Sequence, residues 1–364
     1  MGETIINSNQ LRASGDTSTQ TLIGANQVRQ SGDSSSQTLL NKNQIASGGG
    51  TVGTPVDYVR DMYSDGTIIN YMTKKNGKIW YRAGADRKNI YYSTKIDLSD
   101  ESSKAVHTQG TTTIIFGNNI NIGIYWDDRS NKTQLDIYDN DMTYIRTIEK
   151  SFYFGRGSTG ENLDYLIYNG YFYILSQGNI AKVQDDISVN DCSNLISIGD
   201  NGFAFGELEG NEVVVTFNVN GGNSGSKYYV AKLNLDTMVV GTHSSFLYKS
   251  YSSFKATSCV KFNDKYYIAV EGQLYSSTDL STFTQESYNK VYYRIFPYGD
   301  VCYTVAKDGI YKTTDFATYE LWIATTQMTD NYVAMFRTAK AFDDVLIFCY
   351  STAFKTEFVL APIE

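Results

Sequence analysis

The chain has 364 residues, of which 41% are hydrophobic and 19% are charged, so it is long enough for one large globular domain with an appendage, or for two ordinary domains. Its net charge of −8 argues against a partner bound through phosphates or anionic lipid, and we expect no nucleic-acid ligand. No stretch approaches the roughly 20 apolar residues of a membrane helix, so no membrane insertion is expected. The N-terminus has neither a basic region nor an apolar run, which predicts no export signal.

A short motif recurs at a constant step in the N-terminal part of the chain. Asn9-Gln10-Leu11-Arg12 returns as Asn26-Gln27-Val28-Arg29 and, without the arginine, as Asn43-Gln44-Ile45. Each copy has few apolar residues and cannot close a core around itself, so we expect a segment over residues 1–55 that other chains hold. The predicted anchoring and assembly residues are Asn9, Gln10, Leu11, Arg12, Asn26, Gln27, Val28, Arg29, Asn43, Gln44 and Ile45.

Three arrangements of this segment stay open. Gly15-Asp16 and Gly32-Asp33 are turn pairs, and short apolar fragments joined by such turns resemble the shaft repeats of trimeric viral fibres, which implies a homotrimer. The copies could instead dock as an extended strip on equivalent sites of a ring or capsid. The third arrangement is a disordered tail rich in Ser, Thr and Gln.

The body, residues 56–364, is predicted to be all-β. A flexible Gly-rich stretch ends at Pro55 and marks the boundary, and 30 Tyr and 18 Phe against 3 Pro favour strands over helices. Short apolar or alternating segments predict strands at residues 68–71, 79–82, 114–116, 165–168, 171–175, 213–217, 228–233, 266–270 and 345–350.

An aspartate followed by an apolar and a small residue recurs along the body. These turns are expected at Asp97, Asp141, Asp186, Asp279 and Asp315, with Asp236 as a looser case. Their spacing, built from about four short strands, is typical of a β-propeller blade. Together with a last segment that lacks the aspartate, residues 331–364, the turns predict seven blades, with six as the alternative. We expect the first and last strands to share one blade, with Tyr58 near Val359.

The two best copies align without gaps. Residues 266–283 match residues 302–319, and each reads as strand, tight turn, strand, aspartate turn, strand. Here the sequence resembles the Asp-box, or BNR, repeat of sialidase-like propellers, Ser-x-Asp-x-Gly-x-Thr-Trp. Ser281 and Ala317 stand at the glycine position of that pattern. The resemblance therefore implies the hairpin turn and no activity.

The sequence offers little material for catalysis, and we expect no enzyme. His107 and His243 are the only histidines and are predicted to be surface residues, which leaves almost nothing for a Ser-His-Asp site or a histidine metal site. A sialidase-like glycan hydrolase remains an alternative because it needs only two carboxylates; the candidates are Asp127, Asp128, Glu207, Glu209 and Glu271.

No cofactor or metal is expected. Asp136 with Asp139-Asn140-Asp141 has many oxygens but lacks the order of a calcium loop, which favours a hydrogen-bonded turn. Cys192, Cys259, Cys302 and Cys349 lie in apolar runs and are predicted to be buried free thiols.

Sugar binding would use aromatic side chains on loops. The candidate ligand residues are Tyr248, Tyr251, Tyr292, Tyr293 and Arg294. Each of them is equally compatible with a place in the core of a blade.

A repeated N-terminal adaptor before a β-rich body resembles the plan of tailed-bacteriophage virion appendages: tail fibres, head fibres and receptor-binding proteins. The resemblance implies a non-enzymatic virion protein, assembled in the host cytoplasm, whose partners are tail, collar or capsid-ring proteins and a host-surface glycan. A cellular propeller lectin is a further alternative.

Overall fold

The computed structural model of the chain describes residues 4–7, 10–12, 23–24, 27–28, 40–41, 58–63, 69–83, 89–96, 98, 100–107, 113–127, 132–150, 163–176, 178–199, 201–220, 226–249, 258–270, 273–286, 294–306, 309–324, 339–342, 345–351 and 356–362. It divides into two compact units. The first is Met1–Tyr58 with Ala341–Leu346 and Leu360–Glu364, and the second is Val59–Lys340 with Ile347–Val359. None of the described residues forms a helix with the length and apolar character needed to cross a membrane.

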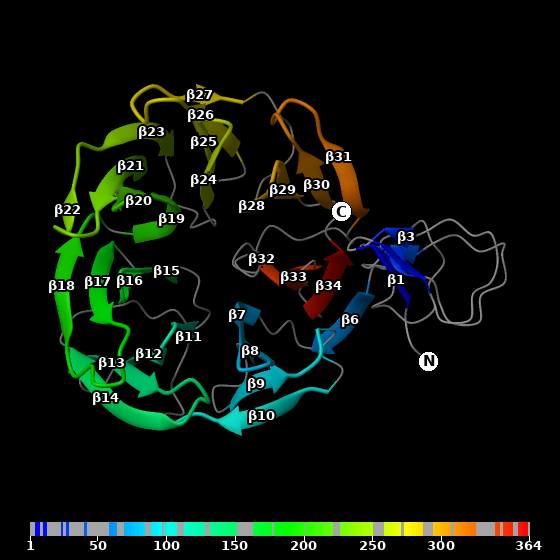
Figure 1. The fold of residues 1–364 in the computed structure, drawn as a ribbon. Coiled ribbons are helices and arrows are strands. Elements are labelled where there is room, and N and C mark those ends of the chain that lie inside the picture. The colour runs from blue at the N-terminus through cyan, green and yellow to red at the C-terminus, as the bar shows by residue number, and fades with distance from the viewer. Residues whose placement is uncertain are drawn as a thin grey trace. The chain divides into compact units, whose positions relative to one another are not determined.

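The second unit contains six blades made of consecutive antiparallel strands, arranged as a ring in which the first strand of each blade lies innermost (Figure 1). The first blade has β7 (Ile69–Lys75), β8 (Lys78–Ala83), β9 (Asn89–Ser93) and β10 (Ser102–Ala105); the second has β11 (Thr113–Phe116), β12 (Asn121–Asp127), β13 (Lys132–Tyr138) and β14 (Tyr144–Lys150).

The third blade has β15 (Leu163–Tyr168), β16 (Tyr171–Ser176), β17 (Asn179–Gln184) and β18 (Cys192–Ser197); the fourth has β19 (Asn201–Glu209), β20 (Glu212–Asn220), β21 (Ser226–Asn234), β22 (Val239–Val240) and β23 (Ser244–Lys249). The fifth has β24 (Ser258–Phe262), β25 (Lys265–Val270), β26 (Gln273–Ser277) and β27 (Thr284–Gln285); the sixth has β28 (Arg294–Tyr298), β29 (Val301–Ala306), β30 (Gly309–Thr313) and β31 (Glu320–Ala324).

A further four-stranded sheet joins the two ends of the propeller chain. Its order is β32 (Ala339–Phe342), β33 (Val345–Ser351), β34 (Thr356–Pro362) and then β6 (Tyr58–Tyr63). The predicted sharing of one sheet by the first and last strands is therefore confirmed. The structure has the six blades of the alternative prediction, and all six are built of consecutive strands within the second unit. The mixed sheet is divided between the two units, so it is not counted as the seventh blade of the preferred prediction.

The core lies between neighbouring blades rather than inside any one of them. Ile122 and Leu135 of the second blade share a buried cluster with Phe172 and Val183 of the third, and Val260 of the fifth blade shares one with residues of the sixth. Since each blade is one sheet thick, it must bury both faces against its neighbours. This explains strands with continuous buried runs, such as β11, in place of strict alternation.

The predicted strands all overlap strands of the structure. The two aligned copies are also confirmed, because β29 and β30 follow β25 and β26 at the same distance along the chain at which the two sequences align. Their partners repeat in register, since Ile268 pairs with Tyr275 and Thr304 pairs with Tyr311.

In the first unit, β1 (Thr4–Asn7), β2 (Gln10–Arg12) and β3 (Ile23–Gly24) form an antiparallel three-stranded sheet, and β4 (Gln27–Val28) and β5 (Leu40–Asn41) form an antiparallel pair. The predicted assembly residues Gln10, Leu11 and Arg12 form β2, and Gln27 and Val28 form β4. The other predicted assembly residues lie outside the described part of the chain: Asn9, Asn26, Arg29, Asn43, Gln44 and Ile45.

Candidate functional site

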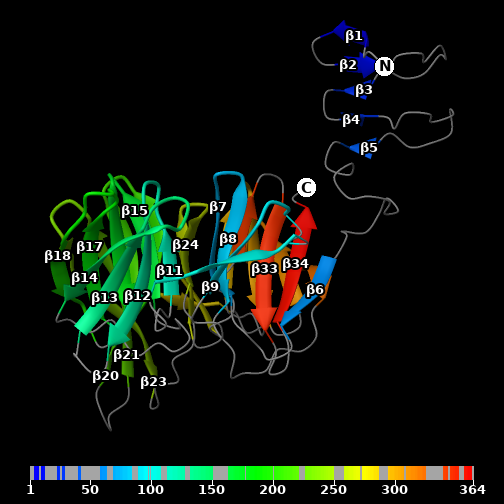
Figure 2. The same ribbon diagram turned by 90° about the horizontal axis from the view of Figure 1, so that it is seen from below.

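The six consecutive blades have two ends of different construction. Because successive strands are antiparallel, the connections from first to second and from third to fourth strand lie at one end, the turn end. The connections from second to third strand, and from each blade to the next, lie at the other, the loop end (Figure 2). Several blade-to-blade connections are long, among them 151–162, 250–257 and 325–338, whereas first-to-second turns such as 76–77 and 169–170 have two residues.

Two of the five predicted ligand residues lie in the described part of the chain. Tyr248 lies in the last strand of the fourth blade and Arg294 begins the sixth. Tyr251, Tyr292 and Tyr293 lie outside the described residues. The two described residues, Tyr248 and Arg294, lie near strand ends at the loop end, next to the connections before and after the fifth blade.

The turn end is formed by tight turns between the first and second strands of the blades. Asn76-Gly77 and Asn169-Gly170 have positive φ at both positions, as a two-residue type I′ hairpin requires. The same left-handed conformation occurs at Asn263.

The aspartate turns between the third and fourth strands also lie at the turn end, and in them a side chain binds the backbone of the turn. Oδ1 of Asp315 accepts the backbone N–H groups of Ala317 and Thr318, both at 2.8 Å, and Asp279 binds its turn with the same two distances. The hydrogen bond from the Thr318 N–H contributes most to lowering the pKa of Asp315 to about 2. Both carboxylates thus serve the turn as hydrogen-bond acceptors.

In two blades the turn acceptor is not the aspartate of the recurring motif. In the second blade Asp139, and not Asp141, accepts the N–H groups of the turn, from Asp141 at 2.9 Å and Thr143 at 2.7 Å. In the fourth blade Asn234 replaces Asp236 as the acceptor, and it receives the Asp236 N–H at 3.1 Å. A short polar side chain can bind the same turn from different positions, so the motif alone does not fix which residue does so.

An apolar residue with positive φ follows in most of these turns. Leu280 (φ 59°) and Phe316 (φ 56°) are examples, and both side chains are buried. Ser281 and Ala317, which stand where the Asp-box has glycine, are not left-handed. The left-handed backbone costs about 1–3 kcal/mol per residue, and burial of the apolar side chain offsets that cost.

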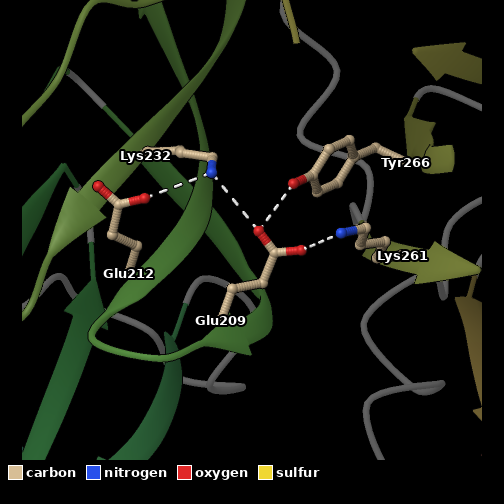
Figure 3. A network of polar contacts seen from close by, with 5 residues as sticks. All are labelled: Glu209, Glu212, Lys232, Lys261 and Tyr266. Carbon is tan, nitrogen blue, oxygen red and sulfur yellow. Dashed lines mark hydrogen bonds and ion pairs between the residues drawn. The ribbon is translucent and has the colours of Figure 1, made fainter. Parts of the chain in front are cut away.

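The fourth and fifth blades are joined by a polar network of five residues at the turn end (Figure 3). Glu209 is its centre: Oε1 accepts Lys261 Nζ at 2.5 Å, and Oε2 accepts the Tyr266 hydroxyl at 2.9 Å. Lys232 bridges Glu209 and Glu212, with Nζ 3.5 Å and 3.3 Å from the two carboxylates. Three strands of the fourth blade are thereby connected to two of the fifth.

A β-bulge positions Glu209 for this role. The pairing of β19 with β20 shifts between Phe205 and Leu208, and such a bulge turns the residues beyond it. A Cβ on Gly206 would lie 3.2 Å from Cys259 Sγ in the fifth blade, so the absence of a side chain permits this close approach. The sequence singled out Glu209 only as one of several carboxylates; the glycine inside a strand was the available signal for the bulge.

The electrostatics of the network are those of an ion pair. The hydrogen bond from Lys261 lowers the pKa of Glu209, and the same contact raises the pKa of Lys261. A glycosidase general acid requires the opposite shift, a raised pKa that keeps the carboxyl protonated. Glu209 is therefore suited to connecting blades and not to donating a proton.

The nucleophiles of the described core are deactivated by burial. Burial raises the pKa of Tyr165 to about 12, and burial likewise raises the pKa of Tyr266 and Tyr267, whereas a tyrosine nucleophile needs activation. Burial also raises the pKa of Cys192 and Cys259 to about 12. These cysteines are buried and free, as is Cys302, which confirms the prediction for these three; the side chain of Cys349 lies outside the described part.

The two histidines lie on the surface, as predicted. The His107 ring stacks on the ring of Tyr144 at 3.6 Å between centroids, and its Nδ1 is 3.8 Å from the buried carboxylate of Asp136. His243 is exposed and meets the ring of Tyr229 edge-on.

The predicted hydrogen-bonded turn at Asp139 is confirmed. The described residues contain no group of three His, Cys, Asp or Glu side chains that could hold a metal ion.

Comparison with known proteins agrees with the fold. No family model matches the sequence, and no curated protein matches it. The WD40 domain of Pan2 from Neurospora crassa is similar with a TM-score of 0.54 at 7% identity, over 84% of this chain and 94% of that one. A chain of the mitotic checkpoint complex gives 0.52 at 11% identity, over 85% and 92%, and the AfRom2 CNH domain gives 0.51 at 8% identity, over 83% and 98%.

The body of the chain is a β-propeller. At such low identity the likeness extends to the fold alone, and what the similar proteins assemble with does not transfer to this chain.

Proposed function

We propose that the chain is a non-enzymatic structural protein of a bacteriophage virion, a fibre or appendage. In this proposal the N-terminal repeats attach it to the particle, and the propeller binds a host-surface glycan or a neighbouring virion protein through its loop end. The observation that carries the proposal is the unequal construction of the two ends of the propeller.

The turn end uses its polar groups internally. Asp315 and Asp279 bind their own turns, and Glu209 joins two blades. The loop end combines longer connections with candidate aromatic residues that flank the fifth blade. Loops on a rigid scaffold are the usual place of recognition, and aromatic residues with a few polar groups suit a sugar ligand.

Binding of the full chain to host cells tests this role. Tyr292→Ala with Tyr293→Ala changes the loop end, while Tyr298→Ala removes an exposed tyrosine at the turn end of the same blade and serves as the matched control. We expect at least a tenfold loss of cell binding for the double variant and less than a twofold change for the control.

Equal binding by all three proteins would contradict the assignment of the loop end. Release of reducing sugar from host polysaccharide by the purified chain, abolished by one carboxylate substitution, would instead establish a glycan hydrolase. Sugar binding by a chain that is absent from virions would indicate a lectin.

A further inference from the structure

Lys75 of the first blade places its amine against an asparagine of the second. Lys75 ends β7, and its Nζ donates to the backbone carbonyl of Gly117 at 2.6 Å and to Oδ1 of Asn121 at 3.4 Å. Both acceptors are uncharged oxygens. The amine of one blade is therefore held against a carboxamide of the next.

The carboxamide of Asn121 is buried and fixed in orientation. Asn121 begins β12, and 1% of its surface is exposed. Its Nδ2 donates to the backbone carbonyl of Asp139 at 2.7 Å, so its oxygen faces Lys75 and its nitrogen is bound elsewhere. Such burial keeps water from competing with the amine as a nucleophile.

Burial favours the reactive form of the amine. It lowers the pKa of Lys75, while the carboxylates of Asp185 and Asp139 act in the opposite direction. A desolvated lysine is a nucleophile because its neutral form is favoured. The same desolvation raises the pKa of Tyr165 and Cys259, so burial deactivates those nucleophiles and activates the lysine.

We propose that Lys75 and Asn121 react with each other and form an isopeptide bond between the first and second blades. The two groups are already in hydrogen-bond contact, and fixed proximity of this kind lowers the barrier to a reaction between them. The inference goes beyond the proposed function and holds whether or not the chain is part of a virion.

The reaction exchanges one amide for another and needs no oxidant or further reactant. The Lys75 ammonium first passes a proton to the carboxylate of Asp139, whose Oδ1 accepts two N–H groups of its turn and whose Oδ2 remains for the proton. The neutral amine then attacks Cγ of Asn121; the Nζ–Cγ bond forms and the Cγ–Nδ2 bond breaks. One amine proton and the proton held by Asp139 pass to Nδ2, which leaves as an ammonium ion, and the last amine proton stays on the new amide.

Mass spectrometry of the full chain, denatured after folding, tests the proposal. We expect a mass about 17 Da below that of the sequence, which corresponds to the loss of one ammonia, and a proteolytic fragment that joins the peptides of Lys75 and Asn121. Lys75→Arg keeps a cation beside the same oxygens but removes the reactive amine. This variant should have the mass of its sequence and yield no joined peptide.

Lys104→Arg is the matched control. Lys104 lies in the last strand of the same blade and also reaches the second blade, where it binds the backbone carbonyl of Asp141 at 2.6 Å and Oγ1 of Thr143 at 3.2 Å. Neither partner is a carboxamide, so this variant should keep the joined peptide.

A wild-type chain without the joined peptide would overturn the proposal, even if it had lost ammonia at another asparagine. The same loss of mass in Lys75→Arg would also overturn it. The joined peptide is read from the wild type alone, so the test stands even if a variant fails to fold.

Discussion

The carboxylate of Asp185, in the third blade, accepts a hydrogen bond from the backbone N–H of Ile120 in the second blade at 3.0 Å. The same carboxylate accepts the N–H groups of Asn118 at 2.7 Å and Asn119 at 3.0 Å. Asp185 is buried, so these three amides replace the water that a carboxylate otherwise needs. One side chain thereby holds the first-to-second turn of the neighbouring blade.

Asp185→Ala should destabilise the propeller strongly. It leaves three amides at a buried junction without their acceptor, and we expect a loss of about 3 kcal/mol or more in the free energy of unfolding, measured by urea denaturation. Asp186→Ala is the matched control, because Asp186 is less buried and its carboxylate accepts hydrogen bonds from Ser188 in its own turn. Equal losses for the two variants would contradict the role given to Asp185.

Gly117→Ala should be the most costly glycine substitution at this junction. A Cβ there would lie 2.6 Å from Asp185 Oδ1 and 2.7 Å from the Ile120 carbonyl oxygen, and overpacking of this kind costs about 1–3 kcal/mol or more.

Gly170→Ala provides the comparison for Gly117. Nothing lies within 4 Å of its Cβ position, but φ is +78°, so only backbone strain of about 1 kcal/mol is expected. Thermal unfolding of both variants measures the difference. A Gly117→Ala protein as stable as Gly170→Ala would show that this junction accommodates the added methyl group without overpacking.

Stability should fall as the pH decreases from about 4 to about 2. The pKa of Asp315 is lowered from 3.8 to about 2 by the N–H groups of its turn, and that of Asp100 is lowered to about 2 by hydrogen bonds from Ser93 and Thr94. A carboxyl whose pKa is lower in the folded state stabilises it above the unfolded pKa, and protonation removes this contribution. Melting temperatures measured between pH 5 and pH 2 test this.

Asp315→Asn isolates one contribution to that pH dependence. Asparagine keeps an oxygen acceptor for the turn but does not titrate, so the variant should lose less stability than the wild type over the same pH range. An unchanged pH dependence in the variant would mean that the Asp315 turn does not contribute.

Glu209→Gln should weaken the connection between the fourth and fifth blades. Glutamine cannot form the ion pair with Lys261, and it leaves Tyr266 with a weaker acceptor, so we expect a loss of about 1–2 kcal/mol in the free energy of unfolding. Tyr266→Phe combined with Glu209→Gln should cost less than the sum of the two single changes, because the residues share a hydrogen bond. Additive losses in a double-mutant cycle would argue against the network.

The sequence predicted those features that depend on local pairing. The hairpins that end at Asp279 and Asp315 were predicted with their turns, because strand, turn and capping residue lie close together along the chain. The mixed sheet of β6 and β34 was predicted from the general need to protect sheet edges.

Features that depend on contacts between blades were not predictable in the same way. The importance of Asp185 follows from amides of a different blade, far away along the chain, and Glu209 reaches Lys261 and Tyr266 only because a bulge turns it. The choice of Asn234 over Asp236 as a turn acceptor depends on a small chain offset, which the pattern did not determine.

The proposed virion role is tested most directly by immunogold electron microscopy of bacteriophage particles purified from a culture that produces this chain. With antibody raised against the propeller, we predict gold at discrete appendages of intact virions. Antibody that detects the protein in the infected-cell lysate but labels no purified particle would contradict a virion role.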